Sequence, residues 1–88
     1  MKIKEGYVLR EVARNNIVVP LGDAEVSFKG IMTLNDVGTF IWKMLENGAT
    51  KEELLNAVLN EYDVDEETAS KDIDRYIVKL RAETIIED

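Results

Sequence analysis

Cysteine and histidine are both absent from this chain of 88 residues. Without cysteine there is no disulfide, no thiolate metal site and no cysteine nucleophile. Without histidine the chain lacks the usual general base near neutral pH and the commonest metal ligand. The two serines, Ser27 and Ser70, therefore have no histidine with which to form a catalytic pair. We expect no enzymatic activity.

Glycine is sparse and long apolar runs are missing. The five glycines stand singly, so no glycine-rich phosphate loop is present. No apolar run approaches the roughly 18–20 residues of a membrane helix, and the N-terminus lacks the apolar core of a signal peptide. Asp63, Asp65 and Glu67 alternate along the chain, but the glycine and distal glutamate of a calcium loop are missing. We expect a cytoplasmic protein with no metal and no cofactor.

Acidic residues outnumber basic ones by 18 to 11, which gives a net charge of −7. The excess is concentrated near the C-terminus, where residues 61–88 hold ten acidic and four basic side chains. A nucleic-acid-binding protein gains affinity by neutralising phosphates, so we expect no nucleic-acid partner. Two interpretations stay open: the acidic side chains keep a small protein in solution, or they select a partner by charge.

Three strands are predicted in the first third of the chain. Two segments rich in β-branched and aromatic residues, 7–13 and 17–21, flank a turn at 14–16. Pro20 cannot donate to a strand ladder, so its part of the second strand should lie at an edge or a bulge. The alternation of apolar and polar residues over 24–29 is the pattern of a half-buried third strand.

Three amphipathic helices are predicted after the strands, each with a capping residue. Asn35 begins the first, which ends at Asn47-Gly48, and Asp65 begins the third. Thr50 and Glu53 have the spacing of a capping box at the start of the second helix. The tail, 84–88, is predicted to hold a short extended piece.

Two residues of the first helix stand out. Glycine within a helix costs about 1 kcal/mol relative to alanine, so we expect Gly38 to mark the close approach of another group, such as the packed sheet; the alternative is a neutral surface position. Trp42 lies one position beyond the apolar stripe, where we expect a wall of the core with its N–H at the boundary.

The predicted order is three strands followed by three helices in a single domain, 1–88, with the helices covering one face of a small sheet. If the third strand lies at an edge, its free backbone groups form a template for an added strand. Asp72, Arg75, Tyr76 and Lys79 share one face of the third helix. That face is either simply solvated, or it forms with the strand a groove for an extended peptide.

The sequence resembles the PqqD-like family over nearly its whole length. The most specific matches are Leu34-Asn35 followed by Gly38 and Trp42, then Gly48-Ala49-Thr50, and finally Tyr62-Asp63-Val64. The resemblance implies an α+β, winged-helix-like fold with a three-stranded antiparallel sheet followed by three helices. It also implies a non-catalytic peptide chaperone, a recognition element for ribosomally made peptides that become natural products.

Family members bind the leader of a precursor peptide as an added strand, in a cleft between the third strand and the third helix. They deliver it to a modifying enzyme, such as a radical S-adenosylmethionine enzyme, or to a leader protease and cyclase. The pathway, whether to pyrroloquinoline quinone, a lasso peptide or another product, is not specified. The matching peptide-binding positions are Glu25, Val26, Ser27, Phe28, Asp72, Arg75, Tyr76 and Lys79.

Three other classes of protein share parts of this pattern. A winged-helix DNA-binding protein needs basic residues at the start of its recognition helix, whereas the third helix here begins Asp65-Glu66-Glu67. An acyl carrier protein needs Asp-Ser-Leu at a helix start, but Ser70 lies in Ala-Ser-Lys. A protein–protein interaction or dimerisation module, without a role in peptide delivery, remains the alternative.

Overall fold

The computed structural model describes residues 1–22 and 32–87. Within them the elements are β1 (Lys2–Ile3), β2 (Tyr7–Val12), β3 (Asn15–Pro20), β4 (Met32–Leu34), α2 (Asp36–Glu46), α3 (Lys51–Glu61), α4 (Glu66–Ala82) and β5 (Ile86–Glu87). A three-stranded antiparallel sheet, ordered β2-β3-β4, precedes three helices, which confirms the predicted fold class. The predicted strand over 24–29 lies outside the described residues.

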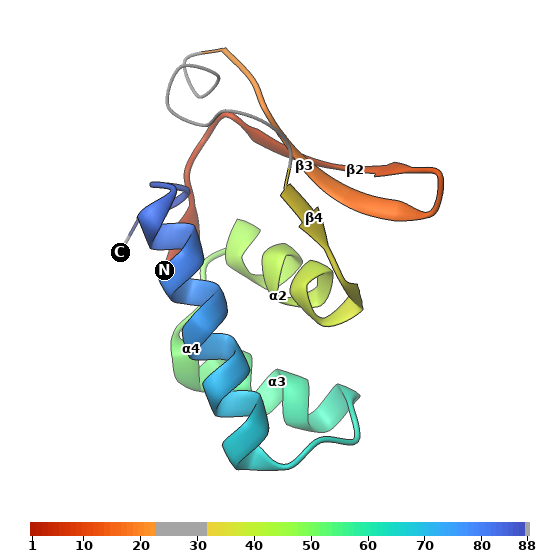
Figure 1. Ribbon diagram of the computed structural model, residues 1–88. Helices are drawn as coiled ribbons and strands as arrows, with labels where there is room; N and C mark the ends of the chain where they lie inside the picture. Colours follow the sequence, from red (N-terminus) through yellow and green to blue (C-terminus); the bar gives the residue numbers. More distant parts are fainter. Residues whose placement is uncertain (23–31, 88) are drawn as a thin grey trace.

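The sheet begins with a hairpin whose turn differs slightly from the prediction. Ala13 and Arg14 have φ angles of 50° and 69°, and two positive φ values in a two-residue turn match the twist of paired strands. The turn thus begins before the predicted 14–16, and Asn15 already belongs to β3. The hairpin projects from the rest of the molecule (Figure 1).

Pro20 lies in a part of β3 that is paired on one side only among the described residues. It pairs with Tyr7 of β2, whereas β4 pairs only with residues 16–18 of β3. The missing N–H of Pro20 therefore breaks no ladder on the β4 side, as predicted.

The two ends of the chain meet in a small ribbon. β1 pairs antiparallel with β5, with Ile3 opposite Ile86. The extended piece predicted in the tail is therefore confirmed, and its partner β1 was not predicted. The amino group of Met1 also donates to the Ala49 carbonyl oxygen at 3.0 Å. The ribbon thereby holds both termini against the helices.

All three predicted helix caps are confirmed. The Asn35 side chain accepts a hydrogen bond from the Gly38 N–H at 2.7 Å, and Asp65 accepts one from the Thr68 N–H at 3.0 Å. The capping box of Thr50 and Glu53 is complete, with bonds of 3.1 and 2.9 Å. These bonds satisfy N–H groups that a helix start leaves without a partner.

The core is centred on α2, which contacts β1, β4 and α3 (Figure 1). Trp42 is fully buried, and its Nε1–H has no hydrogen-bond partner in the described part of the chain. The prediction that this N–H lies at the boundary is therefore wrong. Because α2 is covered on more than one side, a residue just beyond its apolar stripe is also buried.

No helix among the described residues is both long and apolar enough to cross a membrane.

Candidate functional site

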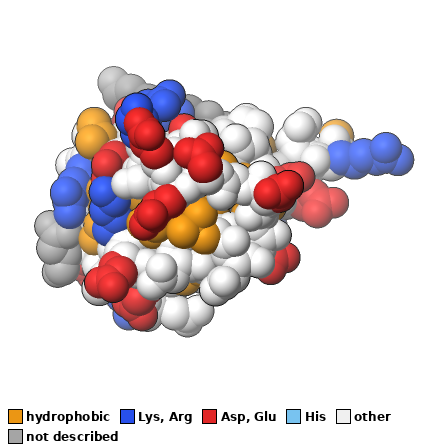
Figure 2. Space-filling view, turned by 90° about the horizontal axis from the view of Figure 1, so that it is seen from below, with side chains coloured by type: hydrophobic (Ala, Val, Ile, Leu, Met, Phe, Trp, Pro, Cys, Tyr) orange, Lys and Arg blue, Asp and Glu red, His pale blue; other side chains and the backbone are white. Residues whose placement is uncertain are grey.

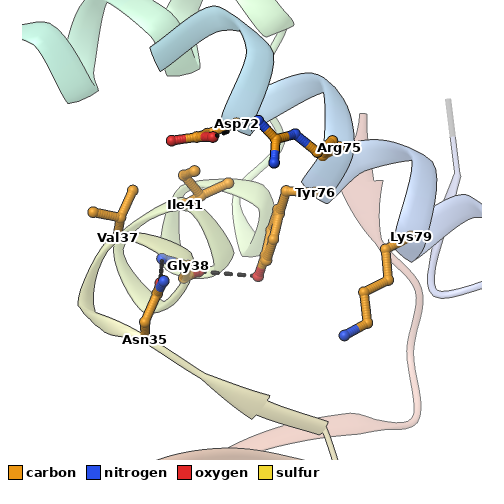
Figure 3. Close-up of a pocket in the computed structure, with 8 residues that line it drawn as sticks. All are labelled: Asn35, Val37, Gly38, Ile41, Asp72, Arg75, Tyr76 and Lys79. Carbon is orange, nitrogen blue, oxygen red and sulfur yellow. Dashed lines mark hydrogen bonds and ion pairs between the residues drawn. The ribbon is translucent and has the colours of Figure 1, made fainter. Parts of the chain in front are cut away.

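A groove of about 390 Å³ lies between the first turns of α2 and the middle of α4 (Figure 3). Its walls are Asn35, Val37, Gly38, Ile41, Asp72, Arg75, Tyr76 and Lys79. Four of these residues come from α2 or its cap and four from α4. The groove is therefore a feature of helix packing, and its shape depends on how closely the two helices approach.

The α4 wall consists of the four helix residues that the sequence analysis selected. Their spacing places Asp72, Arg75, Tyr76 and Lys79 on one face of the helix, and all four line the groove. Arg75 and Asp72 form an ion pair at 3.3 Å, with 78% and 56% of their side chains exposed. An ion pair this exposed contributes little to stability, so both groups are available to a ligand.

A hydrogen bond between Tyr76 and Gly38 joins the two helices. The Tyr76 hydroxyl donates a hydrogen bond to the Gly38 carbonyl oxygen at 3.0 Å (Figure 3). A Cβ atom at position 38 would lie 3.4 Å from the tyrosine ring and 3.1 Å from Oδ1 of Asn35. The close approach predicted for Gly38 is thus confirmed, but the approaching group is a side chain of α4 and not the sheet.

Burial also changes the chemistry of Tyr76. Removal of its phenol from water disfavours the charged form and raises the pKa of Tyr76 well above its usual range. The hydroxyl therefore stays protonated and remains a hydrogen-bond donor throughout the neutral range. The tyrosine ring is part of the groove lining and lies between Val37 and Lys79 (Figure 3).

The charge of the groove contrasts with that of the whole chain. Arg75 and Lys79 bring two cations and Asp72 one anion, whereas the chain carries −7. Arg75 is paired within its own helix, but Lys79 forms no ion pair with any of the described residues. No group of acidic residues in the described part of the chain is arranged to hold a metal ion.

The α2 side of the groove was not selected as a site from the sequence. Val37 and Ile41 belong to the apolar stripe of the first predicted helix, and Asn35 is its predicted cap, so the sequence marks none of them as a binding residue. Gly38 was the one signal, because a glycine within a helix indicates a close neighbour. The other predicted positions, Glu25–Phe28, lie outside the described residues.

One wall residue of the groove lies at the end of a strand of the sheet. Asn35, which lines the groove, directly follows β4. Within the described ranges β4 has a strand partner only on its β3 side. The third strand of the described sheet is thus Met32–Leu34, and the backbone of its other side is a place where an extended chain can add.

Comparison with solved structures finds two similar chains. One is TbiB1 in complex with the TbiA(beta) leader peptide, with 28% identity and a TM-score of 0.78, covering 99% of this chain and 95% of that one. The other is lasso peptide synthetase B1 complexed with the leader peptide, with 16% identity and a TM-score of 0.76, covering 99% and 96%. At 16% identity the second likeness shows the fold alone.

Comparison with families agrees with the resemblance read from the sequence, although no curated protein matches the chain. The family described as coenzyme PQQ synthesis protein D matches residues 7–86. That match includes the hairpin, β4, all three helices of the described fold and every residue of the groove. The chain belongs to the PqqD family.

Proposed function

We propose that this protein is a non-catalytic chaperone that binds the leader of a ribosomally made precursor peptide. The leader adds as a strand to the open side of β4, and its side chains enter the groove between α2 and α4. The observation that carries the proposal is that β4, paired on one side only among the described residues, leads directly into Asn35 of the groove wall. Both similar solved structures are complexes with leader peptides, which supports the same kind of ligand here.

In the proposed role, the protein works in the cytoplasm, where ribosomes make the precursor peptide. Its last step is to deliver that precursor to a partner. The partner is a modifying enzyme, either a radical S-adenosylmethionine enzyme or a leader protease and cyclase. Asp72, Arg75, Tyr76 and Lys79 supply the helix half of the peptide site. β4 supplies the strand half among the described residues, and Glu25, Val26, Ser27 and Phe28 remain proposed strand positions outside them.

The test is a titration of isotope-labelled protein, followed by NMR. The ligands are synthetic N-terminal segments of small open reading frames beside the gene. We expect saturable shifts of amide signals in two places, Met32–Leu34 and Asp72–Lys79. Absence of shifts with every such peptide, or shifts confined to the β2–β3 hairpin, would contradict the proposal.

A charge reversal tests the helix half of the site separately. Arg75→Glu should weaken peptide binding at low salt, because it replaces a cation of the groove with an anion. Lys71→Glu is the matched control: it makes the same change on α4 at a position outside the groove, where Lys71 pairs only with Glu67 at 3.1 Å. If the two variants bind the peptide with equal affinity, the α4 face that carries Arg75 is not part of the peptide site.

The alternative function, a dimerisation module, is favoured by the same open strand. A second copy of the chain could pair along β4 in place of a peptide. Gel filtration across a wide range of protein concentration distinguishes the two. A monomer that binds peptide supports the chaperone function. A dimer that stays intact when peptide is added supports the dimerisation function.

A further inference from the structure

A smaller cavity of about 70 Å³ adjoins the groove. The two share Val37 and Asp72 as walls, so the cavity opens beside one end of the groove. Its other walls come from α3, the α3–α4 connection and the first turns of α4. They are Val58, Tyr62, Val64, Ala69 and Ile73.

The chemistry of this cavity suits a hydrocarbon group better than water. Asp72 is the one charged residue among its walls, and the remaining walls are aliphatic or aromatic. A buried water makes about three hydrogen bonds, and walls that are mostly hydrocarbon offer it few partners. A branched aliphatic side chain gains free energy from the apolar walls that it covers.

Charge differs between the two ends of the groove. In Figure 3, Val37 and Lys79 lie on opposite sides of Tyr76. The cavity end is bordered by the α3–α4 connection, where residues 61–67 contain five acidic side chains, all exposed. Figure 2 shows acidic side chains around a small apolar area on the face seen from below. Carboxylates of a ligand are therefore repelled at the cavity end and attracted at the Lys79 end.

We propose that the bound peptide has two anchors, an aliphatic side chain that fills the cavity behind Val37 and a carboxylate that pairs with Lys79. This inference rests on the proposed peptide-binding function and specifies the class of peptide. Because the two anchors lie at opposite ends of the groove, they also determine the direction in which the peptide runs. A peptide with the two residues exchanged would place its carboxylate among acidic side chains.

The experiment is a selection from a displayed library of random linear peptides. It uses the full chain, two variants and two matched controls. Ala69→Val adds two methyl groups to a cavity wall, and Ala82→Val makes the same change at an exposed position of α4. Lys79→Glu reverses the charge at the other end of the groove, and Lys71→Glu reverses a charge elsewhere on α4.

The wild-type chain should enrich peptides with an aliphatic and an acidic residue at one constant spacing and order. Selection on Lys79→Glu should replace the acidic residue with a basic one, and selection on Ala69→Val should lose the aliphatic preference. For the wild-type consensus peptide at low salt, Lys79→Glu should weaken binding about two- to thirtyfold, because the charge reversal costs about twice the free energy of one exposed ion pair. The loss should shrink at high salt. Both control variants should select the wild-type consensus.

Failure of this inference is distinguishable from failure of the proposed function. If peptides are enriched without the two anchors, or if Lys79→Glu selects the wild-type consensus, the inference is wrong while peptide binding stands. If no peptide is enriched by the wild-type chain, the proposed function is wrong and the inference falls with it. Lys79 is exposed, so Lys79→Glu should fold normally. The test therefore stays decisive even if Ala69→Val disturbs folding.

Discussion

The hydroxyl of Tyr76 donates to the carbonyl oxygen of Gly38 across 3.0 Å, and this bond connects the middle of α4 to the first turn of α2. Both residues line the groove. A Cβ atom at position 38 would already touch the tyrosine ring at 3.4 Å, and loss of the phenol hydroxyl would leave the helices without this polar connection. The width of the proposed peptide site is therefore set by a glycine on one helix and a tyrosine on the other.

Tyr76→Phe should lower the free energy of unfolding by about 0.5–1.5 kcal/mol, the usual net value of one hydrogen bond. The loss belongs at the lower end of that range, because helix geometry gives the Gly38 carbonyl a second partner. Urea unfolding, followed by the fluorescence of Trp42, measures it. The ring of phenylalanine preserves the aromatic part of the groove lining at position 76, so peptide affinity should stay within about twofold of wild type. A loss of affinity larger than the loss of stability would mean that the hydroxyl itself contacts the peptide.

The stability of the protein should fall in alkaline solution, partly through Tyr76. Its pKa is raised in the folded state by burial, whereas the unfolded chain has a tyrosine pKa of about 10. The folded state thus holds the proton more tightly. This contribution is fully present below about pH 10 and is lost as the pH rises through the pKa of the folded state.

Urea midpoints measured from about pH 9 to about pH 11 test this dependence, and Tyr76→Phe should have the shallower decline. Tyr7, whose pKa is raised by burial and by the nearby charge of Glu83, is present in both proteins and cancels in the comparison. Identical slopes for the two proteins would show that Tyr76 ionises equally easily in the folded and unfolded states.

Gly38→Ala should fail to stabilise α2, although alanine is favoured over glycine in helices by about 1 kcal/mol. The new methyl group would lie 3.1 Å from the Asn35 side-chain oxygen, which must then move by a few tenths of an ångström, so that its hydrogen bond with the Gly38 N–H is weakened or lost. Loss of such a cap costs about 1 kcal/mol, so the two effects should cancel.

A double-mutant cycle with Asn35→Ala separates these two effects. Once the capping side chain is absent, Gly38→Ala should become stabilising by several tenths of a kcal/mol, up to about 1. The free energies of unfolding should thus be non-additive. Additive values would show that Asn35 and the new methyl group do not compete for space.

The shared helix face of Asp72, Arg75, Tyr76 and Lys79 in the proposed site was predictable from the sequence because it depends on local chemistry. Caps such as Asn35 and Asp65 act on N–H groups a few residues away, and a spacing of three and four places residues on one helix face. The strand half of the site depends on tertiary structure. β4 is only three residues long, too short for a pattern of alternation, and it is recognised as a strand through its pairing with β3. Trp42 was misplaced for the same reason, because the sequence of α2 does not specify how many of its sides are covered.

Stability should also decline in acid, through the cap of α4. The pKa of Asp65 is lowered mainly by the hydrogen bond that its carboxylate accepts from the Thr68 N–H, and also by the bond from the Thr68 hydroxyl. A lowered pKa in the folded state contributes stability that is present above about pH 4, the pKa of an aspartate in an unfolded chain, and is lost as the pH falls through the folded value. Asp65→Asn keeps a capping oxygen that cannot titrate in this range, so its stability should depend less on pH there. Thr68→Val, which removes one of the two donors, should give an intermediate slope in urea midpoints. If Asp65→Asn has the slope of the wild-type protein, the cap does not contribute to the acid sensitivity of the fold.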